Sequence, residues 1–281
     1  MERHSLALVD ADIIVYRALE KNMVWFGDDA TVNLPRAKED FENTFFDWIL
    51  PLKADREVLC LSHEFNFRKV LNPTYKASRL KDKPDGYYEL RTWIKQAFRP
   101  VVLENLEADD AIGIMLTSTP RAVAVSIDKD MLTLPGIHYN PVKNVLKSQT
   151  EAEADLYWLR QSLSGDPVDG YKGIPGIGPK KAAGILHTEA PVEVLWTVYL
   201  EAYEKAGLTP EDAVMQARMA RILRKTDYDQ GQVRWTAPVP VERGELPPEY
   251  RRNVSKGRNA PAGRHCSPDD GSGSGRREDH A

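Results

Sequence analysis

Short apolar runs alternate with stretches of helical hydrophobic spacing over the first 130 residues. The runs cover residues 6–9, 58–61, 101–103 and 122–127. Helical spacing occurs from Ile13 to Leu19 and again over about residues 37–50, 86–98 and 108–117. Because strands that alternate with helices form parallel sheets, we expect an α/β domain over residues 1–154, with a parallel sheet flanked by helices.

The second half of the chain has a different pattern. From Asp155 to about residue 226 the spacing is helical, apart from a glycine- and proline-rich hairpin at residues 173–179. This predicts a small helix-hairpin-helix subdomain over residues 155–235. Residues 236–281 contain several prolines, then few apolar residues, and predict a Pro-rich linker and a disordered tail.

Carboxylates follow three of the four apolar runs. Asp10 follows the first run, Glu104 and Glu107 the third, and Asp128 and Asp130 the fourth. Ligands of open α/β sheets lie beyond the carboxyl ends of the strands, so we expect these side chains to meet in one pocket. Taken singly, each has a simpler interpretation as a turn or helix-capping residue, and Asp12 fits the cap of the first helix better than Asp10.

The segment Leu106–Ile112 places Glu107 and two further carboxylates, Asp109 and Asp110, in one turn of a helix. Such a cluster alone can simply stabilise a helix N-terminus. Together with the other strand ends, however, it would crowd like charges, which raises carboxylate pKa values unless cations neutralise them. Only two cysteines occur, Cys60 and Cys266, so the ligands would be oxygens.

Oxygen ligands favour Mg²⁺ or Mn²⁺. Two such ions about 3.5–4 Å apart can activate a water molecule and neutralise a leaving oxygen. The acidic pattern therefore predicts phosphodiester hydrolysis at a two-metal site.

Composition is that of a globular protein, with 42% hydrophobic and 28% charged residues. The formal net charge of −4 argues at first sight against nucleic acid, but basic residues gather at 68–83 and 172–181. An acidic pocket beside basic surfaces explains such a total. No apolar run approaches a membrane span and the N-terminus lacks signal-peptide features, so we expect a cytoplasmic protein without membrane association.

The hairpin is the most specific motif in the chain. Gly173, Gly176 and Gly178 permit a tight turn and leave backbone N–H groups open at the start of the next helix, where phosphate binds well. Lys180 and Lys181 add positive charge. A glycine-rich loop without a partner is the alternative, but the string Gly-Ile-Pro-Gly-Ile-Gly-Pro-Lys-Lys-Ala is more particular than a generic turn.

With this motif the chain resembles the 5′-nuclease family from about residue 5 to about residue 190. The family includes flap endonucleases, the 5′-nuclease domain of bacterial DNA polymerase I and phage 5′-3′ exonucleases, and the length favours the stand-alone phage group, which would act in the host cytoplasm. The resemblance is carried by residues 8–12 with Tyr16-Arg17, by Phe67-Arg68, and by residues 75–79, 107–110, 126–130 and 165–182.

The resemblance implies a PIN-like fold and a metal-dependent 5′-3′ exonuclease. It implies that two Mg²⁺ or Mn²⁺ ions are held by Asp10, Glu107, Asp109, Asp110, Asp128, Asp130, Asp166 and Asp169. Lys76 and Arg79 would steer the scissile phosphate, although a solvated basic helix face is the alternative. The implied DNA contacts are Arg68, Tyr75, Gly173, Gly176, Gly178, Lys180 and Lys181, with K⁺ on the hairpin carbonyls. Tyr75 would stack on a base, but an isolated aromatic is more often core.

Some positions depart from the family pattern. An aspartate usual after the second strand is missing from the segment 61–64, where His63 or Glu64 could substitute. Thr133 and Gly170 stand where glutamine and asparagine are usual. Two alternatives therefore stay open: a nuclease-inactive protein that binds DNA structures, and a PIN-type ribonuclease. The expected partner is DNA with duplex 5′ ends or flaps, or an RNA–DNA hybrid, bound by a monomer.

Overall fold

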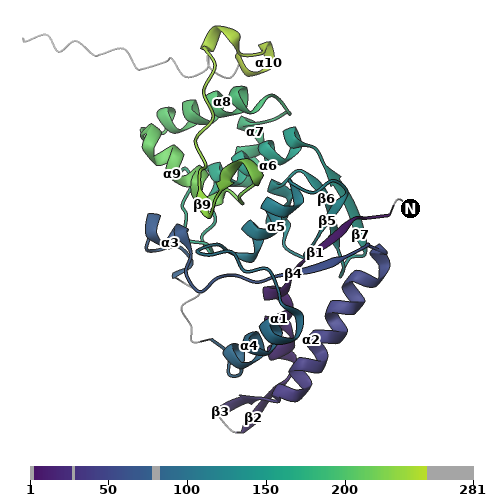
Figure 1. Cartoon of the computed structure of the whole chain (residues 1–281). Coiled ribbons are helices and arrows are strands. Elements are labelled where there is room, and N and C mark those ends of the chain that lie inside the picture. The colour runs from purple at the N-terminus through teal and green to yellow at the C-terminus, as the bar shows by residue number, and fades with distance from the viewer. Residues whose placement is uncertain (1–2, 27–28, 78–82, 252–281) are drawn as a thin grey trace, which may run out of the picture. The chain divides into compact units, whose positions relative to one another are not determined.

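A mixed five-stranded sheet forms the centre of the first of two compact units, residues 1–245 and 246–281. The computed structural model describes residues 3–26, 29–77 and 83–251. The strand order is β4-β1-β5-β6-β7, with four parallel strands and β7 antiparallel at one edge (Figure 1). The strands are β1 (Leu6–Asp10), β4 (Glu57–Cys60), β5 (Ala122–Val125), β6 (Gly136–Asn140) and β7 (Val145–Gln149).

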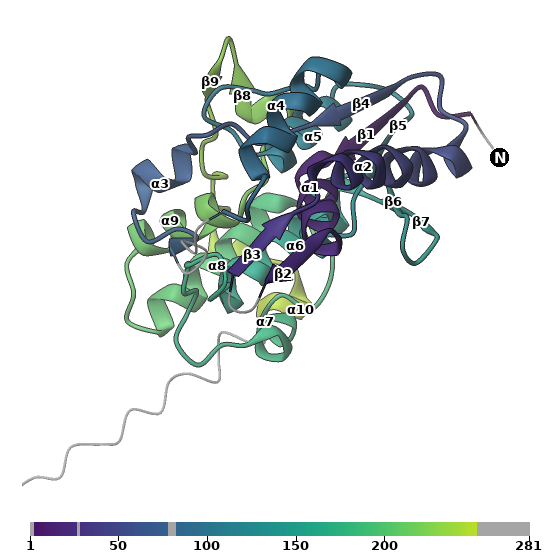
Figure 2. The ribbon, with the colours of Figure 1, turned by 90° about the horizontal axis from the view of Figure 1, so that it is seen from below.

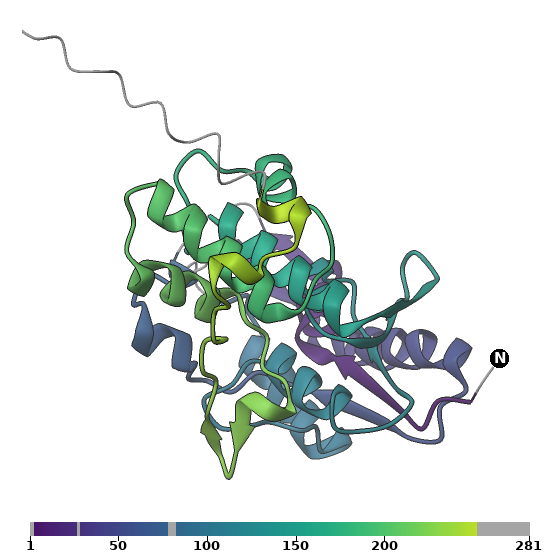
Figure 3. The same ribbon diagram turned by 90° about the horizontal axis from the view of Figure 1, so that it is seen from above.

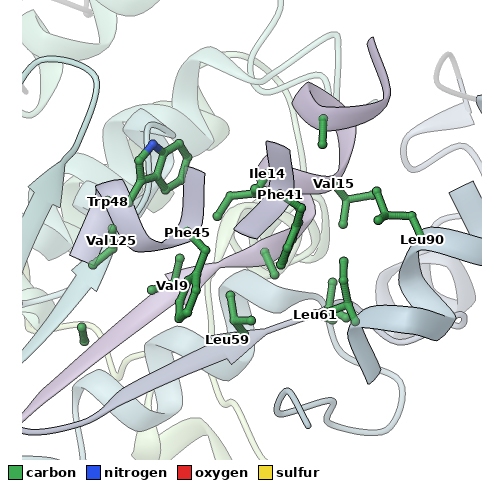
Figure 4. Packing of buried hydrophobic residues seen from close by; sticks show 14 of the residues in the cluster. Val9, Ile14, Val15, Phe41, Phe45, Trp48, Leu59, Leu61, Leu90 and Val125 are labelled. Atoms are coloured by element: carbon green, nitrogen blue, oxygen red, sulfur yellow. The ribbon is translucent and has the colours of Figure 1, made fainter. Parts of the chain in front are cut away.

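Strand β1 is buried on both faces, and its alternating side chains belong to two separate hydrophobic cores. Ala7 and Val9 pack with α1 (Ala11–Lys21), α2 (Leu34–Ile49) and α4 (Tyr87–Phe98), whereas Leu6 and Leu8 pack with α5 (Ala108–Leu116). Figure 4 shows Val9 close to Phe45 of α2 in the first core. Helices on both faces therefore hold the central strand, which fixes the position of the residue at its carboxyl end.

The helical part of the first unit follows β7. It contains α6 (Glu151–Ser164), α7 (Pro179–Ile185), α8 (Val192–Lys205) and α9 (Pro210–Ala220). Helix α6 begins with a capping box in which Thr150 and Glu153 bond each other's backbone N–H. Helices α6, α8 and α9 pack together around buried Trp158 and Trp196 (Figures 2 and 3). The domain boundary proposed at residues 154 and 155 falls within the first turns of α6.

The helix-hairpin-helix consists of α6, the loop 165–178 and α7. The other described elements are β2 (Met23–Phe26), β3 (Asp29–Val32), α3 (Phe67–Leu71), β8 (Tyr228–Asp229), β9 (Gln232–Val233), α10 (Pro248–Arg251), and the 3-10 helices η1 (Leu50–Leu52), η3 (Lys129–Thr133), η4 (Lys225–Asp227) and η5 (Arg243–Glu245). Residues 252–281 of the expected tail lie outside the described residues. Over the ranges described, no helix has the length and apolar character of a membrane span.

Two sequence-based expectations about the sheet need correction. Residues 101–103 were expected to form a strand, but Val101 makes only a single parallel bridge to Cys60 before the chain turns towards α5. Strands β6 and β7 and the separate β2–β3 hairpin were not predicted. Strands β6 and β7 mix polar and apolar side chains, and most of β7 is exposed, so neither of these two has the continuous apolar pattern of a buried parallel strand.

Gly113 in the middle of α5 marks a close approach of two backbone segments. A Cβ atom at this position would overlap the carbonyl oxygen of Leu223. Replacing a glycine by alanine inside a helix normally stabilises it by up to about 1 kcal/mol. We expect Gly113→Ala instead to lower the free energy of unfolding by about 1–3 kcal/mol, because the added methyl group has no space.

Urea denaturation measures this effect, and Gly184→Ala in α7 is the matched control. A Cβ at Gly184 would meet no atom within 4 Å, so its substitution is expected to leave stability unchanged or raise it. Equal effects of the two substitutions would show that the close approach of α5 and Leu223 is not a constraint.

Candidate active site

The predicted acidic residues line one open pocket of about 790 Å³ at the carboxyl ends of β1 and β5. Its acidic lining consists of Asp10, Asp12, Glu64, Glu107, Asp109, Asp128, Asp130 and Asp169. Six of the eight predicted metal ligands are among them, and Asp110 and Asp166 are not. The sheet therefore brings together carboxylates that lie up to about 160 residues apart in the sequence.

Asp10 is the last residue of β1 and the cap of α1. Its carboxylate accepts hydrogen bonds from Ile13 N at 3.5 Å and from Ser126 Oγ at 3.1 Å. Asp12 was expected to be the cap, but it accepts from Ser62 N at 3.0 Å and pairs with Arg91 Nη1 at 2.5 Å. The expectation was wrong because the strand ends one residue before α1, which places Asp10 at the capping position.

Asp128 and Asp130 lie at the start of η3, just beyond β5. Asp128 Oδ1 accepts from the backbone N–H of Asp130 at 2.9 Å, so the Asp-Lys-Asp sequence does form the turn that was its simpler interpretation. The Asp130 carboxylate nevertheless lines the pocket. Its Oδ1 is buried and has no hydrogen-bond partner among the described residues. A buried carboxylate oxygen without a donor is suited to a cation.

Three of these carboxylates resist ionisation. Burial, together with the charge of Asp12 and then of Asp128, raises the pKa of Asp10 to about 7. Burial and the charges of Asp10 and Asp128 also raise the pKa of Asp109 well above its usual range. For Asp130, burial and Asp128 raise the pKa to about 6. Like charges crowded in this way favour a bound cation, which would lower all three pKa values.

Glu107 is already neutralised by the protein. Lys76 Nζ lies 2.6 Å from Glu107 Oε1, while Tyr75 Oη donates to Oε2 at 2.9 Å and Arg68 Nη1 donates to it at 3.2 Å. Burial opposes ionisation, but Lys76 and Arg68 still lower the pKa of Glu107 to about 2. In the described part of the chain, no three acidic, histidine or cysteine side chains stand close enough to hold an ion as they are placed. The oxygen donors fit a divalent ion if Lys76 withdraws and the carboxylates draw together.

Lys76 is fixed over the pocket by its backbone as well as by its side chain. Its N–H donates to Asp169 O at 2.9 Å, and its Nζ lies 3.8 Å from Asp169 Oδ2. This position suits the predicted role of Lys76 beside a scissile phosphate. Arg79, the other residue predicted to steer the phosphate, lies outside the described residues.

Three predicted site residues are buried and bonded to other side chains of the protein. Arg68 is 3% exposed and forms a bidentate ion pair with Asp110, which is fully buried. Tyr75 is also 3% exposed, with the guanidinium of Arg68 and the ammonium of Lys76 near its ring. Arg68 and Tyr75 nevertheless line the pocket, so DNA contact by Arg68, base stacking by Tyr75 and metal binding by Asp110, directly or through water, stay predictions. Their sequence pattern could not show burial, because charged residues are rarely buried.

The hairpin exposes the residues predicted to contact DNA. Gly176 and Gly178 are open to solvent, and Lys180 and Lys181 are exposed at the start of α7. Lys181 Nζ donates to the carbonyl oxygen of Gly176 at 2.8 Å. Gly173 has a φ of 59° and packs against the backbone of residues 163–165, so it shapes the loop from inside.

The loop before the hairpin carries Asp169 to the pocket. Asp166 accepts from the backbone N–H groups of Val168 and Asp169 at 2.8 and 3.2 Å, which organises the turn. Gly170 has a φ of 80°, and a Cβ there would crowd the carbonyl oxygen of Thr74 at 2.5 Å. This contact explains why glycine stands where the family pattern has asparagine.

The segment 61–64, which lacks the aspartate usual in the family, contributes packing and backbone contacts. Leu61 is buried in the core, and Ser62 Oγ accepts from Ala108 N at 3.0 Å at the start of α5. His63 and Glu64 line the pocket, and Glu64 is exposed. Sequence reasoning missed Arg91, which pairs with Asp12, and Gln161, which also lines the pocket. Neither lies in a motif, and only the fold brings them to the pocket.

Known proteins resemble this chain in sequence and in fold. No protein-family model matches it. The exonuclease of Escherichia phage T7 is 32% identical over 210 residues, covering 61% of this chain and 70% of that protein. The exodeoxyribonuclease of Enterobacteria phage T3 is 32% identical over 211 residues, covering 61% and 69%.

Among solved structures, the flap endonuclease of bacteriophage T5 has a TM-score of 0.58 at 13% identity, covering 80% of this chain and 90% of that chain. A likeness at so low an identity shows the fold alone. The phage T7 exonuclease, however, shares 32% identity over more than two thirds of its length. Together with the carboxylate pocket and the hairpin, this similarity shows that the chain belongs to the 5′-nuclease family of phosphodiester hydrolases and groups with the phage exonucleases.

Proposed function

We propose that the protein is a 5′-3′ exonuclease that hydrolyses DNA with two Mg²⁺ or Mn²⁺ ions and releases 5′-phosphorylated products. The observation that carries this proposal is the convergence of Asp10, Asp109, Asp128 and Asp130 in one pocket. Three of them have raised pKa values, and one has a buried oxygen without a donor. Bound cations would stabilise such a pocket.

The names of the relatives support DNA as the substrate. The phage T3 relative is named an exodeoxyribonuclease, and a relative from Shewanella oneidensis, 31% identical over 151 residues, is named a flap endonuclease. The solved T5 structures include one with DNA and metal ions and one with zinc. We therefore infer that duplex 5′ ends and flaps are substrates, and that an RNA–DNA hybrid is a further candidate.

The residues of the pocket would have separate roles in the hydrolysis. When bound, the ions would activate a water molecule and neutralise the charge that develops on the leaving oxygen. Asp10, Asp109, Asp128 and Asp130 would hold them, with Glu107 and Asp169 at the Lys76 side of the pocket. Lys76 would donate to the scissile phosphate and orient it for attack.

The hairpin would hold the duplex at a distance from the pocket. Its exposed glycine backbone and the two lysines of α7 can contact phosphate oxygens, which carry no sequence information. The carbonyl of Gly176, now paired with Lys181, is a candidate for K⁺. We infer an enzyme that recognises DNA ends or structure and does not read bases.

Cleavage of 5′-labelled duplex DNA tests the proposed function. We expect nucleotide release with Mg²⁺ or Mn²⁺ and none with a chelator, and we expect Asp128→Ala to abolish cleavage while DNA binding stays measurable. Cleavage that survives in the chelator would contradict the metal mechanism. Binding without cleavage by the wild-type protein would instead support the alternative of a nuclease-inactive DNA-binding protein.

Substrate preference is measured in the same assay. Blunt duplex, flap and RNA–DNA hybrid are compared at equal concentration, each labelled at the 5′ end. Preference for the DNA duplex or flap is expected from the hairpin. Cleavage restricted to RNA would favour a PIN-type ribonuclease and would overturn the proposed substrate.

The two hairpin lysines provide a separate prediction. Replacing Lys180 and Lys181 together by alanine should weaken DNA binding and flatten its dependence on salt, with the slope of log K against log salt falling by about 2. The catalytic rate at saturating DNA should change little, because neither lysine lines the pocket. Titrations at several salt concentrations measure the slope, and an unchanged slope would remove these lysines from the interface.

A further inference from the structure

The segment from Gln216 to Arg224 connects the hairpin to the acidic pocket, and we call it the strap. It begins in the last two turns of α9 and continues as an extended segment beside α5. At its first end, Gln216 Oε1 accepts from the backbone N–H groups of Lys172 and Gly173 at 2.9 and 3.1 Å. The strap therefore holds the start of the hairpin directly.

The middle of the strap holds the turn that carries Glu107 and Asp109. The carbonyl oxygens of Met219 and Arg221 accept from Arg68, whose five N–H donors are all used, the others by Asp110 and Glu107. Leu223 N donates to Asp110 Oδ1 at 3.1 Å. Because Asp110 Oδ2 also accepts from Glu107 N at 3.3 Å, the strap fixes the first turn of α5 through Asp110.

The last residue of the strap reaches η3. Arg224 is 5% exposed, and its Nη2 donates to the carbonyl oxygen of Thr133 at 2.9 Å and lies 2.7 Å from Asp155 Oδ1 of α6. Thr133 is fully buried, and its hydroxyl donates to the carbonyl oxygen of Asp130 at 2.8 Å. Arg224 and Thr133 thus form a continuous path from α6 to the backbone of Asp130, whose carboxylate lines the pocket.

We propose that the strap positions the catalytic carboxylates relative to the DNA-binding hairpin, with Arg224 as the positioning residue for Asp130. This inference rests on the proposed function. Thr133 bonds Asp130 directly, and Arg224 is one contact further away. Residues that bond a metal ligand typically change metal affinity or activity by about 10–100-fold when replaced, so we expect an effect at the tenfold end for Arg224. Gln216, at the other end, would position the hairpin and affect DNA affinity.

The experiment compares Arg224→Gln and Gln216→Ala in the full chain. We expect Arg224→Gln to lower kcat about tenfold or more and to raise the Mg²⁺ concentration for half-maximal rate about tenfold, with DNA affinity in chelator unchanged. Gln216→Ala should instead weaken DNA binding and raise KM while kcat stays near that of the wild type. Arg224→Lys, which keeps one donor for the Thr133 carbonyl, should recover part of the loss.

Thr133→Val tests the same positioning role if Arg224→Gln fails to fold. It removes only the hydroxyl bond to Asp130, and it should shift the Mg²⁺ midpoint in the same direction. Val198→Ala, in the buried face of α8, is the control for a loss of stability caused outside the strap. A folded Arg224→Gln or Thr133→Val variant with the wild-type Mg²⁺ midpoint would overturn the proposal.

A readout without catalysis separates this proposal from the proposed function. The stabilisation of the DNA-free protein by Mn²⁺ in thermal unfolding should need about tenfold more Mn²⁺ in Arg224→Gln than in the wild type. An unchanged Mn²⁺ requirement would overturn the positioning role. A wild-type protein that binds Mn²⁺ but does not cleave DNA would overturn the proposed function and leave the positioning result standing.

Discussion

Replacing Asp10 by asparagine should abolish DNA cleavage and, at the same time, stabilise the metal-free protein. Loss of one ion-binding carboxylate removes several kcal/mol of transition-state stabilisation, so we expect cleavage to fall by about 10³-fold or more. In the absence of metal, the same carboxylate lowers the stability of the folded protein. Its pKa is raised to about 7, mainly by burial and then by Asp12, which shows that its ionised form is disfavoured in the fold.

The pH dependence of this stabilisation follows from the sign of the shift. Below pH 4, Asp10 is protonated in both the folded and unfolded states and does not change the free energy of unfolding. Between pH 4 and 7 the folded protein binds more protons than the unfolded chain, so stability falls as the pH rises. We expect the gain from Asp10→Asn to grow over this window and to reach on the order of 4 kcal/mol above pH 7.

Asp12→Asn is the matched control. Asp12 lies beside Asp10 but is paired with Arg91 at 2.5 Å, so its replacement leaves a buried guanidinium without its partner and should destabilise the protein. Thermal unfolding in chelator and in Mg²⁺ at pH 5 and 8 distinguishes the two. If Asp10→Asn were less stable than the wild type at pH 8 in chelator, the crowded-carboxylate interpretation would be wrong.

Replacing Lys76 by methionine should slow cleavage by about 10²–10³-fold, the usual loss when a donor to a developing charge is removed. The structure adds a second expectation. Lys76 lies 2.6 Å from Glu107 Oε1 and neutralises it, so an incoming divalent ion must compete with the ammonium. Without Lys76, the pKa of Glu107 should rise and the Mn²⁺ concentration for half-saturation should fall.

Single-turnover cleavage and Mn²⁺ titration by thermal unfolding measure the two effects of Lys76→Met separately. Lys53→Met, at an exposed position that does not line the pocket, is the control for loss of a positive charge. Opposite changes in rate and metal affinity are the expected signature. A variant that cleaves at the wild-type rate would remove Lys76 from the mechanism, and weaker Mn²⁺ binding would show that Lys76 assists the ions instead of competing.

Local patterns were enough to predict most of the elements that position the site. Apolar β1 and β5 and the helices α2, α4 and α5 were expected close to their observed bounds, because their periodicity reflects burial. Strands β6 and β7 were missed because they lie towards the sheet edge, where side chains are mixed or exposed. The strand expected at residues 101–103 was wrong because a short apolar run carries no information about pairing.

The composition of the pocket was predictable, but its internal ion pairs were not. Motif spacing identified the carboxylates, and the order of strands explains why they meet. The burial of Arg68 against Asp110 depends on carbonyl oxygens of Met219 and Arg221, about 150 residues away. The capping role of Asp10 depended on a one-residue difference in where β1 ends. Contacts of these kinds arise from packing, which a linear pattern does not encode.

Anomalous scattering from a crystal soaked in Mn²⁺ would show whether the pocket holds two metal ions. We expect Mn²⁺ peaks within coordination distance of Asp10, Asp109, Asp128 and Asp130 oxygens, with Lys76 moved away from Glu107. Binding of Mn²⁺ only elsewhere on the protein, with this pocket empty and its carboxylates as they are here, would contradict the assignment of a two-metal hydrolytic site.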